Sequence, residues 1–198
     1  MRDTQDPRAA QVLDFWFAEY RRSGNSDPRW FGKAPEFDAE IRTRFLALCE
    51  QAAAGDFTAW LDAAGDCLAL VIVLDQFPRN LFRFPRPEAA RAFAADPLAL
   101  AAAKHAVDSG YDTGLRPAER LFLYLPFEHS ESLDEQWRSV SLISRLAPYP
   151  ETADVFSYTV RHWDIVRRFG RFPHRNAALG RASTPQEAEF LKQPGSAF

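Results

Sequence analysis

One strongly apolar run, residues 67–74 (CLALVIVL), constrains the fold of this 198-residue chain more than any other feature. It is eight residues long, far below the roughly 20 residues that a helix spanning a bilayer needs. The triplet Val71-Ile72-Val73 suits a strand as well as a helix. No other run in the chain alternates with period two, and a lone strand has no partner. The sequence therefore predicts a buried helix over residues 66–77.

Helix-forming residues, above all Ala, dominate the rest of the chain, and Pro or Gly separates the helical patterns. We expect an all-α fold and a single domain over residues 1–198, with about nine antiparallel helices joined by short loops. Asp96 before Pro97 is typical of an N-cap, and Ser183-Thr184 with Glu187 resembles a capping box. No 34-residue period repeats, so the pattern alone does not indicate a regular solenoid. The predicted helices and turns cover residues 9–22, 36–54, 58–63, 66–77, 88–94, 96–109, 118–125, 132–146, 151–169 and 185–192, and the predicted core includes Trp16, Phe45, Leu70, Ile72, Phe122 and Trp163.

Charge and cysteine content exclude several classes of protein. The formal net charge of −3 gives no support for a nucleic-acid or membrane partner. Residues 1–10 are charged and no purely apolar stretch follows them, unlike a signal peptide. The two cysteines, Cys49 and Cys67, make no disulfide framework. We therefore expect a cytoplasmic protein with reduced thiols and no cofactor.

Three polar clusters follow apolar helical patterns at a proline. Residues 77–80 (FPRN) recur as residues 172–176 (FPHRN), and residues 126–131 (PFEHSE) form the third cluster. Because Pro disrupts helical hydrogen bonding, we expect Pro78, Pro126 and Pro173 each to end a helix. Arg and Asn beyond a helix end commonly cap its free carbonyl groups, so three separate caps are one interpretation. The other is that all three clusters converge on one polar cleft.

The charge distribution leaves similar alternatives open. Residues 161–181 contain six arginines and one Asp, whereas residues 128–135 contain four acids and no base. The two blocks either neutralise each other inside the fold or leave some arginines to bind an anion. His129 and His162 are candidate acid–base groups, although a histidine near aromatic residues is more often a hydrogen-bonded core residue. Motifs for metal ligation, nucleotide binding and a serine nucleophile are missing from the sequence, and we expect no metal.

The motifs at residues 12–17 (VLDFWF), 74–80 (LDQFPRN), 124–131 (YLPFEHSE) and 169–176 (FGRFPHRN) resemble the bacterial family known as domain of unknown function 924. Trp30-Phe31 and Leu179-Gly180-Arg181 extend the resemblance, which covers about residues 11–191. Phe127 departs from the Leu or Met that is frequent there. The resemblance implies an all-helical, tetratricopeptide-like array and implies no activity.

Three hypotheses of function follow. The first is a binding module for a small anionic metabolite or a carboxylate-bearing peptide. The second is a hydrolase in which Glu128 or His129 is the general base, with His162 as a further catalytic candidate. The third is a structural scaffold whose polar clusters form an internal ion-pair network. The candidate binding residues are Asp75, Gln76, Arg79, Asn80, Glu128, His129, Glu131, His162, Arg168, Arg171, His174, Arg175 and Asn176.

Overall fold

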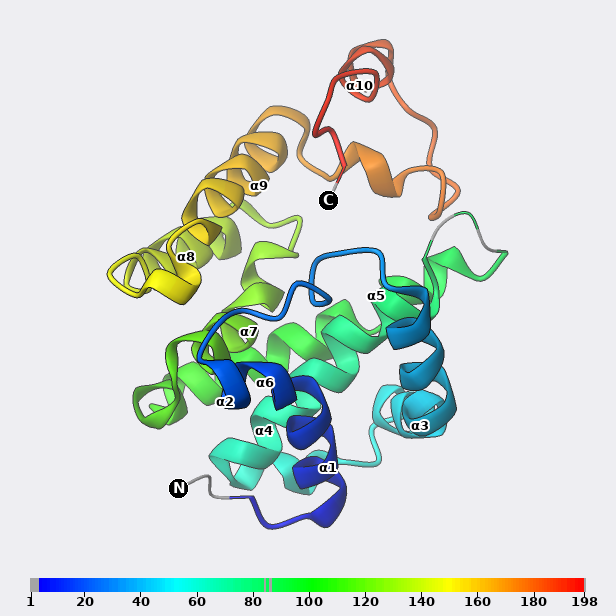
Figure 1. Ribbon diagram of the computed structural model, residues 1–198. Coiled ribbons are helices and arrows are strands. Elements are labelled where there is room, and N and C mark those ends of the chain that lie inside the picture. Colours follow the sequence, from blue (N-terminus) through cyan, green and yellow to red (C-terminus); the bar gives the residue numbers. More distant parts are fainter. Residues whose placement is uncertain (1–3, 84, 86, 198) are drawn as a thin grey trace.

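A computed structural model describes residues 4–83, 85 and 87–197, and all regular structure in these ranges is helical, without a strand (Figure 1). The all-α prediction is confirmed, whereas the tetratricopeptide-like arrangement stays a prediction. None of the helices described is long and apolar enough to cross a bilayer. The α-helices are α1 (Pro7–Trp16), α2 (Ala18–Ser23), α3 (Pro35–Ala53), α4 (Ala64–Val71), α5 (Phe77–Leu81), α6 (Asp96–Asp108), α7 (Pro117–Glu128), α8 (Leu133–Ser144), α9 (Val155–Phe169) and α10 (Pro185–Phe190).

The apolar run forms the centre of the molecule, as predicted. Helix α4, a π-helical turn η2 (Ile72–Gln76) and α5 follow one another without a gap, and residues 65–78 are all buried. Helices α1, α6 and α7 pack against α4, and α3 packs against η2 and α5. Phe77 places its ring 5.0 Å from that of Phe45 and 5.6 Å from that of Trp16. Burial on all sides explains why this segment shows no polar face in the sequence.

Two of the three predicted helix breaks are wrong. The chain stays helical through Pro78, because the π-helical turn directly precedes it and the Phe77 amide donates to the Ile72 carbonyl five residues earlier. This wider turn relieves the conflict between a proline ring and the preceding turn. Pro126 lies inside α7, which continues to Glu128. Only Pro173 follows a true helix end, since Gly170 closes α9 in a left-handed conformation.

Other helix boundaries differ from the prediction at particular residues. The segment predicted as one helix over 9–22 divides at Phe17 into α1 and α2. Asp96 is the first residue of α6, makes no capping hydrogen bond, and leaves the N-cap position to Ala95. The capping box of Thr184 and Glu187 is confirmed at the start of α10. Trp163 is only half-buried and contacts exposed Trp137, whereas the other five predicted core residues are buried.

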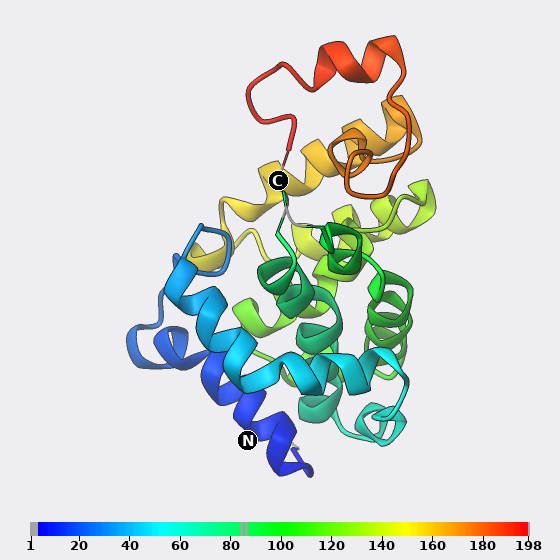
Figure 2. The same ribbon diagram turned by 90° about the vertical axis from the view of Figure 1, so that its right-hand side faces the viewer.

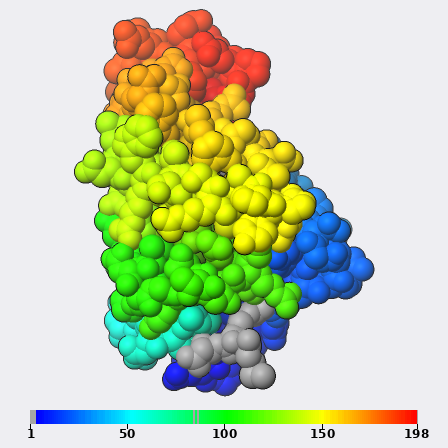
Figure 3. Space-filling model, turned by 90° about the vertical axis from the view of Figure 1, so that its left-hand side faces the viewer, coloured from blue at the N-terminus to red at the C-terminus, as the bar shows by residue number. Residues whose placement is uncertain are grey.

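From α6 onward, α7, α8 and α9 stack in the order of the chain, whereas α1, α3 and α6 pack around the central segment of α4, η2 and α5. The N-terminal helices lie at one end, α8 and α9 lie beyond α7, and the C-terminal segment with α10 lies at the opposite end (Figure 2). On the molecular surface, cyan, green, yellow and red follow one another, and a blue N-terminal segment lies beside the green and yellow part (Figure 3). Residues of the central helix therefore contact residues of the C-terminal segment only along the boundary between the N-terminal and the C-terminal parts of the molecule.

The central helix generates the first prediction. Ile72 has no exposed surface, so Ile72→Ala removes buried methyl groups and leaves a cavity. We expect the free energy of unfolding to fall by about 2–5 kcal/mol. Urea denaturation followed by circular dichroism measures this loss. Leu98→Ala is the control, because Leu98 is an exposed residue of α6 and its truncation creates no internal cavity. Equal stability of Ile72→Ala and the parent protein contradicts the assignment of this segment to the core.

Candidate functional site

Asp75, in the π-helical turn, is the most deeply buried charged residue of the candidate site. Its carboxylate has no exposed surface and lies 2.8 and 3.0 Å from Nδ1 of His129, at the end of α7. Nε2 of Gln76 donates to it at 2.5 Å, and Nη1 of Arg79 lies 3.2 Å away. Burial raises the pKa of Asp75, but the charge of Arg79 and the hydrogen bonds from His129 and Gln76 outweigh it and hold that pKa well below its usual value. Asp75 is therefore ionised at neutral pH.

Two arginines share a second carboxylate. Arg79 binds Asp96 through two nitrogens, at 3.1 Å each, and Nη1 of Arg175 lies 3.3 Å from the same carboxylate. Arg79 also donates to the Asp75 carbonyl at 2.6 Å. The guanidinium of Arg175 lies 4.4 Å from the ring centre of Phe172 and 4.8 Å from that of Phe93. The two FPRN-like segments, far apart in sequence, thus meet at one side chain.

Arg175 is incompletely compensated in this position. It is 6% exposed, and its Nε is buried without a hydrogen-bond partner among residues 4–83, 85 and 87–197. Burial, followed by repulsion from Arg79, lowers the pKa of Arg175 to about 10. A buried cation with one long contact to a shared carboxylate carries a desolvation cost that its neighbours do not fully offset.

Glu128 and His162 form a second buried acid–histidine pair. Oε1 of Glu128 lies 3.3 Å from Nδ1 of His162, which also lies 2.9 Å from the carbonyl of Tyr158. Burial raises the pKa of Glu128 to about 7. The ring of His162 lies 6.2 Å from that of His129, which joins the two pairs. Glu128, predicted from a supposed helix break, is instead the last residue of α7.

All three histidines of this region are held in the neutral state. Burial lowers the pKa of His129, with Arg79 as the next cause, and lowers that of His162 well below the usual value. The pKa of His174 falls to about 3 through burial and the charge of Arg175. We call Asp75, Arg79, Asp96, Glu128, His129, His162, His174 and Arg175 the polar cluster. Within the part of the chain that the structure describes, no group of His, Cys, Asp and Glu is arranged to hold a metal ion.

The remaining predicted residues have other partners. Asn80 donates to Asp38 at 2.7 Å, and Asn176 donates to Ser183 at 3.0 Å. Gln76 contacts the polar cluster through Asp75 and belongs to its margin. The other three make ion pairs: Arg171 with Glu187, Arg168 with Asp164, and Glu131 with Arg181. Of these three pairs, the one between Glu131 and Arg181 joins the acidic block to the basic block, as the neutralising interpretation expects.

Sequence reasoning missed two contributors to the cluster. The sequence predicts Asp96 as an N-cap because Pro follows it. Nothing in the sequence around Asp96 indicates that its carboxylate binds two arginines. Phe93 is an apolar residue, and the sequence does not indicate that it contacts a polar site. Only the approach of α6 to α5 and to the FPHRN segment reveals their role.

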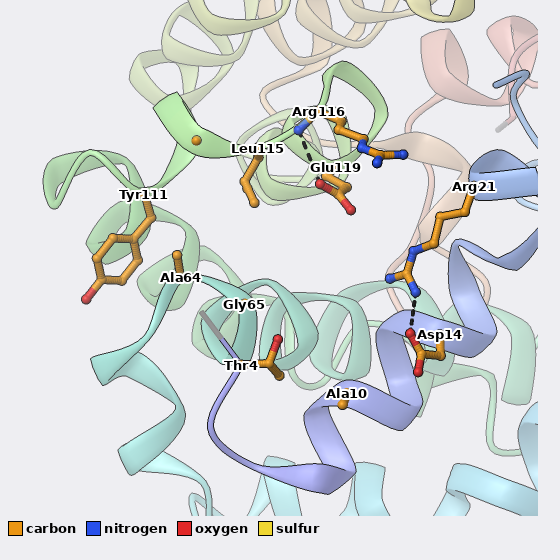
Figure 4. A pocket seen from close by; sticks show the side chains of 11 residues that line it. Thr4, Ala10, Asp14, Arg21, Ala64, Gly65, Tyr111, Leu115, Arg116 and Glu119 are labelled. Atoms are coloured by element: carbon orange, nitrogen blue, oxygen red, sulfur yellow. Dashed lines mark hydrogen bonds and ion pairs between the residues drawn. The ribbon is translucent and has the colours of Figure 1, made fainter. Parts of the chain in front are cut away.

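A separate pocket of about 480 Å³ lies between α1, α2, α4 and the start of α7 (Figure 4). No predicted site residue lines it. Arg21 pairs with Asp14 on one side, and the Arg116 amide donates to Glu119 on the other. Its charged lining is thus composed of two arginines and two carboxylates of this same chain.

The raised pKa of Glu128 generates a prediction for stability against pH. Below pH 4.5 Glu128 is protonated whether the protein is folded or unfolded, whereas up to about pH 7 only the folded state keeps the proton. The stability that this proton contributes is present at low pH and is lost as the pH rises towards 7, by about 3 kcal/mol. Glu128→Gln stays neutral and escapes this loss, so we expect it to be more stable than the parent protein at pH 8.

Urea denaturation from pH 4.5 to pH 8 measures the difference between the two proteins. Glu189→Gln is the control, because Glu189 is an exposed residue paired with Lys192. A Glu128→Gln protein whose stability follows the parent curve at every pH contradicts the protonated state of the buried carboxyl group.

Comparison with known proteins places the chain in a family. The structure of a protein of unknown function from Agrobacterium tumefaciens, ATU0120, is similar, with a TM-score of 0.81 and 38% sequence identity. The alignment covers 93% of this chain and 97% of that protein. No curated protein matches the sequence. The model of a family described as bacterial protein of unknown function (DUF924) matches residues 12–195, and the chain therefore belongs to this family.

Proposed function

We propose that the polar cluster binds a small anion, and that the protein is a binding module for a carboxylate-bearing molecule. The observation that carries this proposal is Arg175, a buried guanidinium with an unpartnered Nε and one contact at 3.3 Å to an acid that it shares with Arg79. An anion beside Arg175 supplies an acceptor for this Nε–H group. Carboxylates fit this role because their two oxygens match the planar fork of a guanidinium.

The histidine pKa values support a positive local potential. Arg175 is among the causes that lower the pKa of His129, His162 and His174, and Arg79 contributes at His129 and His174. Burial is the largest cause at all three rings. Among the charges, the arginines act ahead of any carboxylate at His162 and His174, whereas Asp75 opposes them at His129. A positive potential in a region of reduced solvent contact favours an anionic ligand.

Exposure indicates from which side a ligand reaches the cluster. The side chain of Arg79 is 21% exposed and that of His129 is 14% exposed, whereas Arg175 lies deeper. A ligand that approaches past Arg79 and His129 meets Arg175 last. The phenyl rings of Phe93 and Phe172, which both lie against the guanidinium of Arg175, then provide apolar contact for the carbon skeleton of the ligand.

The competing interpretation is a scaffold in which the same charges only connect helices. Arg79, Asp75 and Asp96 already satisfy one another in part, and a buried network of this kind also fixes the packing of the surrounding helices. The two interpretations differ in one measurable respect. A scaffold gains no stability from added anions at constant ionic strength, whereas a binding site does.

Thermal denaturation with added succinate, glutarate, citrate and inorganic phosphate tests the proposal, with sodium chloride used to equalise ionic strength. Ligand at 100 times its Kd stabilises the folded state by about 2.7 kcal/mol, which raises Tm by roughly 5–10 °C in a chain of this size. We expect Arg175→Gln and Arg79→Gln to lose this increase while they keep a helical circular dichroism spectrum.

Arg83→Gln is the matched control, because Arg83 is a partly buried arginine that pairs with Asp38 outside the polar cluster. It should keep the full response to the anion. A Tm that no anion changes, or an increase that persists in both cluster variants, favours the scaffold.

A further inference from the structure

The pair of Asp75 and His129 has a geometry that goes beyond anion binding. Nδ1 of His129 faces both oxygens of an ionised, solvent-free carboxylate, so Nδ1 carries the proton and donates it. In a neutral imidazole this leaves the lone pair on Nε2. Asp75 thereby fixes both the tautomer and the ring orientation of His129, from a backbone position inside the π-helical turn.

Nε2 of His129 has no structural partner. Among the described residues it makes no hydrogen bond, and it is not among the side-chain nitrogens that are sealed from solvent without a partner. The side chain of His129 is 14% exposed. A ring nitrogen that is neither sealed from solvent nor bonded to the protein is able to hold a water molecule or a ligand. His129 therefore presents a basic nitrogen beside the two arginines.

Among the residues that the structure describes, no nucleophilic side chain contacts this nitrogen. Ser130, the neighbour of His129 in sequence, accepts a hydrogen bond from the Ser132 amide and makes no contact with the ring that the structure describes. Cys49 and Cys67 are buried elsewhere in the core, and burial raises the pKa of both thiols to about 12. The group that His129 is placed to deprotonate is therefore water rather than a side chain of the chain itself.

We propose that His129 is the general base of a hydrolytic site that acts on esters whose acyl part ends in a carboxylate. This inference rests on the proposed anion binding, in which Arg175 holds the carboxylate of the substrate. Nε2 takes a proton from a water molecule, and the water oxygen forms a bond to the ester carbonyl carbon. The carbonyl becomes an oxyanion beside Arg79, which contacts the same Asp75 as His129 does.

The carbon–oxygen bond to the leaving alcohol then breaks, and the alcohol takes the proton from Nε2. The products are a dicarboxylic acid and an alcohol, and water is the only co-reactant. Asp75 is a positioning residue in this scheme, because it acts through His129 and touches neither water nor ester.

The experiment measures hydrolysis of mono-4-nitrophenyl glutarate, with 4-nitrophenyl acetate as the ester that lacks the second carboxylate. We expect the parent protein to hydrolyse the glutarate ester with a kcat/KM at least about 100-fold above that of His129→Gln, the lower end of what general-base catalysis contributes. His129→Gln should lower kcat and leave KM unchanged, because the carboxylate contact to Arg175 persists. Asp75→Asn should reduce kcat with KM kept, which a purely structural role does not produce.

His105→Gln is the matched control for the ester cleavage that any exposed imidazole catalyses. His105 is an exposed histidine of α6 whose ring contacts the carbonyl of Leu61, a residue outside the polar cluster. It should keep the full rate. The acetate ester tests the role of Arg175, because it has no second carboxylate to bind. We expect it to be the poorer substrate and its rate of hydrolysis to be the same in Arg175→Gln as in the parent protein.

Equal rates for the parent protein and His129→Gln on the glutarate ester overturn the inference, and so does a rate that His105→Gln lowers to the same extent. Such a result alongside an intact, Arg175-dependent rise in Tm with glutarate leaves the anion-binding proposal standing. Loss of both responses in the parent protein removes the two proposals together.

Discussion

A carboxylate without solvent contact, that of Asp75, determines how the central part of this protein is assembled. An unpaired charge in such a place costs several kcal/mol, so the surrounding helices have to bring donors to it. α7 contributes the ring of His129, and α5 contributes Arg79, which extends to Asp96 at the start of α6. Arg175 adds the C-terminal segment through that same acid. The relative positions of four segments therefore follow from one buried charge.

The helical architecture was predictable because it depends on local patterns. Helix formers, terminal glycines and prolines, and the burial of one apolar run suffice to locate most elements, and the segment at 36–54 differs from α3 by one residue at each end. The prediction failed where tertiary contacts outweigh local preference. Pro78 and Pro126 lie within helices since the surrounding core holds the chain in that conformation. Trp163 is half-buried because it packs at the edge of α9, against Trp137.

The candidate site was only partly predictable. Arg79, Glu128 and His129 do lie together with Arg175, but the reason given for their proximity, three helix ends, holds at Pro173 alone. The repeated Arg-Asn pair is misleading as well. Its arginines share Asp96, while its asparagines bond to Asp38 and to Ser183 in separate parts of the fold. Similarity between two sequence segments shows that they contain the same residue types. Three-dimensional packing determines which of these residues share a partner.

The π-helical turn also has a consequence for comparison between members of the family. Its i to i+5 hydrogen bond encloses one residue more than an α-helical turn, and one residue corresponds to about 100° of rotation around the helix axis. A relative that is one residue shorter between positions 72 and 76 keeps the same apolar composition but turns every later side chain of the helix to a different face. Arg79 then points away from the acid that α6 supplies. Segment length at this turn, rather than residue identity alone, distinguishes relatives that are able to form the polar cluster from those that share only the fold.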